Sequence, residues 1–216
     1  MAARRSARAG PTIHVRPPLP RLHAITDERI ARRADLSDVA RHLASAGGAN
    51  LALHARGREL TGLERYDFSF QLSDFPSPLF VNDRLDIALA LNATGVQLGV
   101  GSLPVGAARH LNPRWWIGKS VHDLAEADAA KAEGADYLLV GPVYATATHP
   151  DHPPLGLETL GRISQLGLPV IAIGGVGPGR AREVQTAGAY GAAAIRALWD
   201  AADPRDAVRQ MLEELQ

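Results

Sequence analysis

Short apolar runs alternate with longer segments of mixed polarity along most of the chain. Each run is only a few residues long and largely apolar, which is typical of strands buried on both faces of a parallel sheet. We expect strands at residues 22–26, 50–55, 78–82, 95–99, 115–120, 136–141, 169–175 and 191–196.

The segments between the runs carry helix signals. Within residues 35–43, Leu36, Val39, Ala40 and Leu43 fall on one face of a helix, as an amphipathic helix requires. We expect further helices at residues 84–91, 123–133, 157–165, 180–187 and 204–215, and glycines suited to C-terminal caps at Gly134, Gly167 and Gly188.

Residues 58–78 give conflicting signals. Thr61 and Glu64 have the spacing of a capping box, which predicts a helix from Gly62. Residues 67–72 alternate between polar and apolar side chains like a strand. The alternation of the rest of the chain requires a helix here, so we leave the boundaries of this element open.

Eight alternations of strand and helix predict a closed (β/α)₈ (TIM) barrel, a single α/β domain over residues 21–216. The alternative is an open doubly wound sheet. That fold usually places a glycine-rich loop after its first strand. Here the first run is followed by Thr26, Asp27 and Glu28, so the barrel is the better prediction.

Residues 1–20 differ in composition from the rest of the chain. They contain several arginines, no acidic residue and a proline-rich segment at residues 17–20. They lack the apolar core of a secretory signal. We expect a basic extension that is disordered or draped over the surface.

Composition narrows the function classes. Lys plus Arg (23) equals Asp plus Glu (23), so no net field favours nucleic acid or an anionic membrane. Cysteine is absent, which excludes disulfides, thiolate metal sites and a Cys nucleophile. No apolar run approaches the roughly 20 residues of a membrane span. We expect a cytoplasmic protein that binds neither nucleic acid nor membrane.

The last two strands end in a pattern that suits a phosphate. The seventh run ends in Gly174 and Gly175, and the eighth ends in Ile195 and Arg196. In TIM barrels the loops after these strands frequently bind phosphate through backbone N–H groups. We therefore expect phosphate binding at these four residues.

Polar side chains follow several other strands. His54, Arg56 and Arg58 alternate, so they point the same way if the strand continues. Two guanidiniums suit an anionic ligand, although Arg58 could also be a solvated strand end. The remaining candidates for ligand binding are Asn82, Gln97, Ser120, Thr146 and Thr148.

Seven motifs give the chain a family resemblance. The sequence resembles the thiamine phosphate synthase/TenI superfamily, which implies a TIM barrel that binds a thiazole phosphate at the Gly174–Gly175 and Ile195–Arg196 loops. The motifs are LHAITD (22–27), HARGR (54–58), VNDRLDIALAL (81–91), GVQLG (95–99), IGKSVHDLAEA (117–127), GADYLLVGPVYATATHP (134–150) and LPVIAIGGV (168–176).

Three departures bear on the branch of this superfamily. The synthase pattern Gln-x-Arg-x-Lys matches residues 54–58, but His54 replaces its glutamine and Arg58 replaces its lysine. Of the two synthase aspartates that hold Mg²⁺, Asp83 matches one and Ser102 replaces the other. The lysine of the synthase Thr-x-Thr-Lys loop is replaced by His149.

These departures favour the TenI-like branch, which includes thiazole tautomerases. The resemblance then implies an isomerase that moves a proton on a carboxythiazole phosphate without metal or other cofactor. Known tautomerases carry a histidine where this chain has Pro142. We therefore expect His54 or His149 to move the proton, with Arg56 holding the carboxylate.

Two alternatives remain. One is thiamine phosphate synthase, a transferase that joins a pyrimidine pyrophosphate to a thiazole phosphate with Mg²⁺ at Asp83. The other is a barrel that binds thiazole phosphate without catalysis. Trp115 and Trp116 belong to the core by default, and their other interpretation is a contact in a homodimer.

Overall fold

Eight parallel strands close into a barrel in the computed structural model, which describes residues 16–146 and 153–216. Each strand pairs with its sequence neighbours, and β8 returns to β1. This confirms the predicted TIM barrel. The strands are β1 (Leu22–Ile25), β2 (Leu51–Ala55), β3 (Leu79–Asn82), β4 (Gly95–Leu98), β5 (Trp116–Val121), β6 (Tyr137–Val140), β7 (Val170–Ala172) and β8 (Gly191–Ala194).

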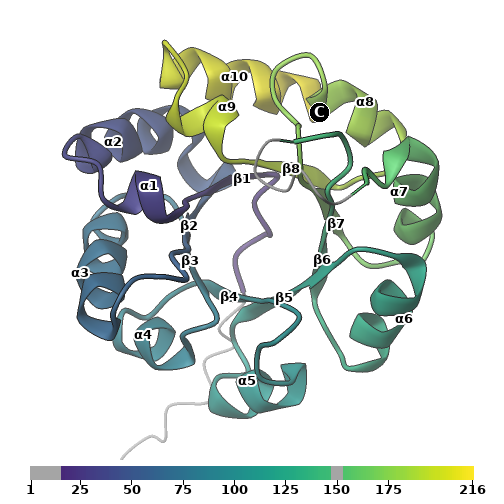
Figure 1. The fold of residues 1–216 in the computed structure, drawn as a ribbon, viewed down its shortest axis with the longest axis horizontal. Coiled ribbons are helices and arrows are strands. Elements are labelled where there is room, and N and C mark those ends of the chain that lie inside the picture. Colours follow the sequence, from purple (N-terminus) through teal and green to yellow (C-terminus); the bar gives the residue numbers. More distant parts are fainter. Residues whose placement is uncertain (1–15, 147–152) are drawn as a thin grey trace, which may run out of the picture.

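Helices surround the barrel as an outer layer (Figure 1). Three of them, α1, α5 and α9, were not predicted from the hydrophobic pattern. They have between four and seven residues, too few for a periodic signal. The helices are α1 (Glu28–Ala31), α2 (Leu36–Gly47), η1 (Gly48–Asn50), α3 (Gly62–Ser73), α4 (Leu85–Ala90), α5 (Val105–Leu111), α6 (Leu124–Ala132), α7 (Gly156–Ser164), α8 (Ala181–Thr186), α9 (Arg196–Trp199) and α10 (Pro204–Glu214).

Helix α3 resolves the ambiguous segment. The Thr61 side chain accepts a hydrogen bond from the Glu64 backbone N–H, and Glu64 accepts one from the Thr61 N–H, which completes the predicted capping box. Residues 67–72 are helical because Phe68 and Leu72, four residues apart, share the buried face. The strand-like alternation in this stretch was misleading.

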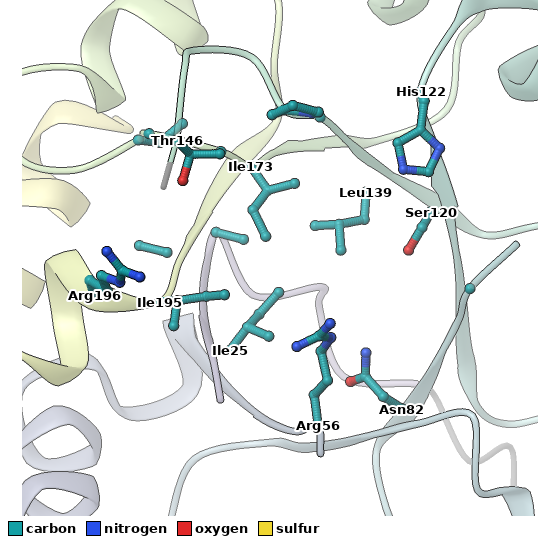
Figure 2. Close-up of a pocket in the computed structure, with 18 of the residues that line it drawn as sticks. Ile25, Arg56, Asn82, Ser120, His122, Leu139, Thr146, Ile173, Ile195 and Arg196 are labelled. Atoms are coloured by element: carbon teal, nitrogen blue, oxygen red, sulfur yellow. The ribbon is translucent and has the colours of Figure 1, made fainter. Parts of the chain in front are cut away.

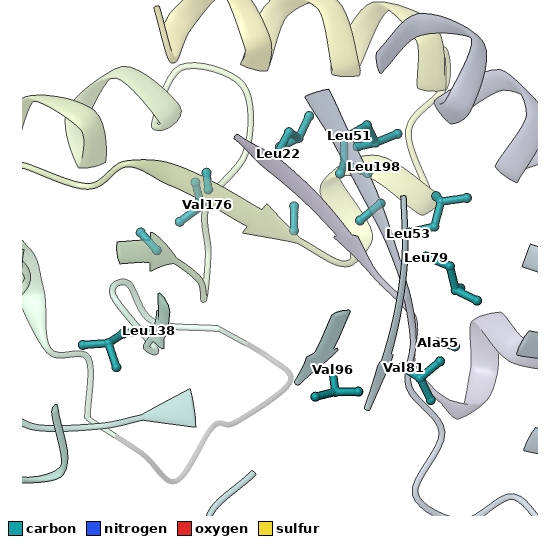
Figure 3. Packing of buried hydrophobic residues seen from close by; sticks show 14 of the residues in the cluster. Leu22, Leu51, Leu53, Ala55, Leu79, Val81, Val96, Leu138, Val176 and Leu198 are labelled. Atoms are coloured by element: carbon teal, nitrogen blue, oxygen red, sulfur yellow. The ribbon is translucent and has the colours of Figure 1, made fainter. Parts of the chain in front are cut away.

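Two apolar cores form because side chains alternate along each strand. One face packs against the helices and includes Leu22, Leu53 and Val81 (Figure 3). The other face points into the barrel and includes Phe80 and Tyr137. The polar interior residues are therefore exceptions in an apolar lumen.

Residues 16–20, here called the strap, cross the barrel (Figure 1). They lie at the end where the strands begin, which we call the lower end. Leu19 is 3% exposed and packs among the lumen residues. The Tyr190 hydroxyl donates to the Leu19 carbonyl at 2.7 Å, and Trp116 Nε1 donates to the Pro17 carbonyl at 2.9 Å. The strap therefore fills the end of the barrel opposite the strand carboxyl ends.

The remaining part of the basic extension, residues 1–15, lies outside the described residues. Trp115 is buried in the helix-facing core, while the homodimer stays a prediction. No helix in the described part of the chain has the length and apolar character to cross a membrane.

Candidate active site

A cavity of about 1430 Å³ opens at the carboxyl ends of the strands. Single small-ligand sites usually enclose about 300–1,000 Å³, so this cavity has room for more than one small molecule. Figure 2 shows Arg56 and Asn82 on one side of it and Thr146 and Arg196 on another. The predicted site residues that line it are Arg56, Arg58, Asn82, Asp83, Ser120, Thr146, Gly174, Gly175, Ile195 and Arg196.

The loop after β2 supplies a cationic wall. The Thr26 hydroxyl donates to the Arg56 carbonyl at 2.8 Å and accepts from the Arg56 N–H at 2.9 Å, which fixes the backbone of this residue. Glu28 accepts the Arg58 N–H at 2.5 Å. Burial, and then the neighbouring charge of Arg58, lowers the pKa of Arg56. A half-buried guanidinium at Arg56 beside an exposed one at Arg58 favours an anionic ligand at this wall.

Asp83 carries the carboxylate of the predicted metal site. Its backbone has a φ of 63°, an unusual conformation for a non-glycine residue. Its Oδ1 accepts hydrogen bonds from the Gly99 N–H at 3.0 Å and from the Ser102 hydroxyl. A carboxylate and a hydroxyl oxygen therefore meet at the cavity wall, beside the Gly99 carbonyl that accepts from Lys119 Nζ at 3.1 Å.

These oxygen donors suit Mg²⁺. This ion is commonly held by one or two carboxylates together with substrate phosphates, not by an all-protein cage. The described residues hold no group of three or more acidic or histidine side chains that could bind a metal by themselves. Asp83 and Ser102 would therefore hold Mg²⁺ jointly with an anionic ligand.

The loops after β6 and β7 are hydrogen-bonded to each other. The Val143 N–H donates to the Ile173 carbonyl at 2.8 Å, and the Tyr144 N–H donates to the Gly174 carbonyl at 3.0 Å. Gly174 has a φ of +95°, and a Cβ there would lie 2.5 Å from Pro142 Cα. Glycine is needed because the two backbones approach so closely.

Tyr144 and Arg180 support this pair of loops. The Arg180 guanidinium stacks on the Tyr144 ring at 4.4 Å and donates to the Gly175 carbonyl at 2.9 Å. The Tyr144 hydroxyl donates to Glu183 at 2.6 Å. Partial burial, followed by that hydrogen bond, raises the pKa of Tyr144 to about 12. The phenol therefore stays protonated as a donor.

Two predicted site residues lie below the cavity wall. His54 and Gln97 are fully buried in the barrel interior. His54 Nδ1 is 3.4 Å from Asn82 Oδ1, and Gln97 Nε2 donates to the Ser120 hydroxyl at 3.0 Å. They contact residues that line the cavity. Thr148 and His149 lie outside the described residues.

Several cavity residues were missed by sequence reasoning. Arg180 follows the predicted glycine pair by five residues, but that reasoning considered only the glycines themselves. Glu126 was also missed. It lines the cavity beside His122, which follows the fifth predicted strand, and His122 Nδ1 lies 3.0 Å from Glu126 Oε2. The signal for this pair was their i, i+4 spacing at the start of a helix. Arg65 lines the same cavity from α3.

Comparison with known proteins identifies the family. A family model described as thiamine monophosphate synthase matches residues 22–198. The chain belongs to this family.

Its relatives share most of their length with the chain. The thiamine-phosphate synthase of Chloroflexus aurantiacus is 39% identical over 88% of this chain and 90% of the relative. That of Pyrococcus furiosus is 38% identical over 90% of this chain and 96% of the relative. A solved structure of thiamine phosphate pyrophosphorylase from Pyrococcus furiosus, at 35% identity, covers 90% of this chain and 95% of that chain with a TM-score of 0.77.

These relatives overturn the prediction of a TenI-like thiazole tautomerase. Proteins 38% and 39% identical to the chain carry the synthase name. The departures from the synthase pattern were given too much weight. Ser102 keeps an oxygen in contact with Asp83, and Arg58 keeps a positive charge in place of lysine. The proton-transfer roles assigned to His54 and His149 fall with the tautomerase prediction.

Proposed function

We propose that this member of the thiamine monophosphate synthase family is a thiamine phosphate synthase, a transferase in thiamine biosynthesis. It would join a pyrimidine pyrophosphate to a thiazole phosphate and release pyrophosphate. The observation that carries the proposal is that two groups of residues suited to anions line one cavity. Arg56, Arg58 and Asp83 form the first, and the loops at Gly174–Gly175 and Ile195–Arg196 form the second.

Two regions fit two charged substrates. A reaction on one phosphate ester needs a single phosphate site. Joining the pyrimidine group of a pyrophosphate ester to a thiazole phosphate, with release of pyrophosphate, needs two anion sites that face a shared space. The cavity volume of about 1430 Å³ accommodates both. The synthase names of the relatives agree with this assignment.

The arginines contribute at the leaving group. When the bond to the pyrophosphate breaks, negative charge collects on its oxygens. Arg56 and Arg58 can donate charge-assisted hydrogen bonds to those oxygens, and this stabilises the charge that develops. Mg²⁺, held by Asp83 and Ser102, would neutralise part of the same charge.

The opposite wall positions the thiazole phosphate. Gly174, Gly175, Ile195 and Arg196 line the cavity, and their backbone N–H groups would donate to a phosphate. Glycine at the first two positions allows a close approach. Arg180, which lines the cavity beside Gly175, adds positive charge. Holding both substrates in one orientation makes the joining step effectively unimolecular.

The test is a synthase assay with both substrates and Mg²⁺, with thiamine phosphate measured by chromatography. We expect product formation that EDTA abolishes and that Asp83→Ala reduces by at least a hundredfold. Asp128→Asn, on the exposed surface of α6, is the matched control and should keep full activity. Binding of both substrates without product would instead support a non-catalytic barrel.

A further inference from the structure

A chain of polar groups runs through the apolar lumen from the strap to the cavity. His23 Nε2 lies 3.0 Å from the Pro20 carbonyl oxygen, and His23 Nδ1 lies 2.7 Å from His54 Nε2. His54 Nδ1 then lies 3.4 Å from Oδ1 of Asn82, which lines the cavity. We call His23 and His54 the histidine relay.

The relay has a direction because its lower end is an acceptor. A carbonyl oxygen has no proton to give, so His23 Nε2 must donate to Pro20. A neutral imidazole carries one N–H, so His23 Nδ1 is an acceptor and His54 Nε2 must donate to it. His54 Nδ1 is then an acceptor that faces the Asn82 amide.

Two acceptors that face each other make no hydrogen bond. Asn82 Oδ1 opposite His54 Nδ1 is such a pair, at 3.4 Å. Turning the amide by half a rotation places its NH₂ group against His54 and turns its carbonyl oxygen away. The oxygen and nitrogen of an amide have nearly the same size, so this exchange needs no change in packing.

If His54 were protonated, its Nδ1 would be a donor and the Asn82 oxygen would face it. The buried site disfavours such a charged ring. Both histidines are fully buried. The His23 ring lies against Phe80 and Tyr137, and the His54 ring stacks on Phe80. Burial lowers the pKa of His23 to about 4 and lowers that of His54 well below its usual value. Both rings are therefore neutral at neutral pH.

We propose that the Pro20 carbonyl fixes both histidines as Nε2–H tautomers and thereby holds the Asn82 carbonyl oxygen toward the cavity. His23 and His54 are then positioning residues that act through Asn82. The wall at Asn82 offers an acceptor for an N–H group of the ligand, and anion binding there is left to Arg56 and Arg58. This holds whichever reaction the cavity performs.

The direct test is the tautomeric state of the two rings in the full-length protein. Long-range ¹H–¹⁵N spectra at neutral pH distinguish a protonated ring nitrogen from a bare one. We expect His23 and His54 to show a protonated Nε2 and a bare Nδ1, with signals assigned by His23→Phe and His54→Phe. An Nδ1–H tautomer or an imidazolium at either ring would overturn the proposal.

The role of the strap is tested by a mild change. Tyr190→Phe removes the hydrogen bond to the Leu19 carbonyl but keeps the ring that stacks with Arg21. We expect a second tautomer to appear at His23. Tyr66→Phe, at an exposed residue of α3, should leave the His23 spectrum unchanged. An unaltered His23 spectrum in Tyr190→Phe contradicts the part assigned to the strap.

The link to Asn82 is tested by binding of inorganic pyrophosphate. His23→Phe keeps an aromatic ring beside Phe80 and Tyr137 but breaks the relay, so the Asn82 amide can turn its NH₂ group to an anion. We expect pyrophosphate to bind about threefold tighter than to the wild type, with His110→Phe, an exposed control, unchanged. Equal or weaker binding in His23→Phe means that the relay does not hold Asn82.

Discussion

At the residue scale, the wall proposed to bind Mg²⁺ differs from the two-carboxylate pattern by one side chain. Asp83 was a predicted candidate because it matches one of the two aspartates of the synthase pattern. The contact between the Ser102 hydroxyl and Asp83 Oδ1 was not predictable, because it depends on the path of an irregular loop after β4. A hydroxyl is a neutral and weaker ligand than a carboxylate. With Ser102 in place of a second carboxylate, the proposed site would bind Mg²⁺ more weakly but would have less charge repulsion when no metal is bound.

Restoring the carboxylate should strengthen metal binding. We expect Ser102→Asp to lower the Mg²⁺ concentration for half-maximal activity by about tenfold, since about 1.4 kcal/mol of added attraction corresponds to that factor. The measurements are the initial rate as a function of Mg²⁺ concentration and a calorimetric titration of the protein with Mg²⁺. Ser45→Asp, at an exposed residue of α2, is the control. An equal Mg²⁺ requirement in the two variants would contradict the role assigned to Ser102.

The buried histidines make stability depend on pH. The unfolded chain binds a proton at His23 near its ordinary pKa of 6.5, whereas burial lowers the folded value to about 4. The unfolded state therefore binds more protons as pH falls. We expect the free energy of unfolding to drop by about 3 kcal/mol between about pH 6.5 and 4 on account of this ring.

Denaturant unfolding across this pH range checks the expectation. His23→Phe should give a shallower pH dependence whatever its stability at neutral pH. Leu63→Ala, at an exposed residue without a titratable group, should keep the wild-type slope. A His23→Phe slope equal to that of the wild type would show that the ring is protonated in the folded protein.

At the element scale, the loops after β6 and β7 act as one unit. The glycine pair at residues 174–175 was predicted to bind a phosphate, and the structure shows that another loop also comes close to it. The partner that approaches it, Pro142, was not predicted, because the contact arises only when β6 and β7 pair in the sheet. Sequence patterns locate strand ends but not which loops touch. Helix α3 shows a similar limit. The capping box predicted where the helix begins, but the alternation of residues 67–72 did not predict which of its side chains are buried.

A methyl group at residue 174 should separate the two loops. The Gly174→Ala Cβ would lie 2.5 Å from Pro142 Cα in a backbone with φ of +95°. We expect at least a tenfold loss of affinity for the thiazole phosphate in calorimetric titrations, with the barrel still folded.

Gly179→Ala separates the clash from backbone strain. Its φ is +85°, yet nothing lies within 4 Å of an added Cβ. We expect this variant to lose some stability and to keep its phosphate affinity. Equal loss of affinity in both variants would assign the effect to strain alone.

At the scale of the whole molecule, the barrel was the most predictable feature. Eight repeated units of the same pattern reinforce each other, so an error in one segment leaves the fold assignment intact. The strap was less predictable. Leu19 stands among prolines without a periodic pattern, and its position in the lumen follows from packing below the strands. The expectation of a disordered or surface-draped extension stays a prediction for residues 1–15.

Leu19 should contribute to global stability. We expect Leu19→Ala to lower the free energy of unfolding by about 2–5 kcal/mol, the usual range for removing a buried leucine side chain. Leu63→Ala, at a residue that is 71% exposed, should change it by less than about 0.5 kcal/mol. Chemical denaturation measures both, and a similarly small effect in Leu19→Ala would show that the strap does not pack in solution.

Closure of the lower end of the barrel by the strap also has a kinetic consequence. In the described part of the chain the cavity opens above the strands, and Leu19 occupies the lower end of the lumen. Both proposed substrates would therefore enter, and both products would leave, on the same side of the barrel. A product that stays at this opening would then compete with arriving substrate, so product inhibition is expected.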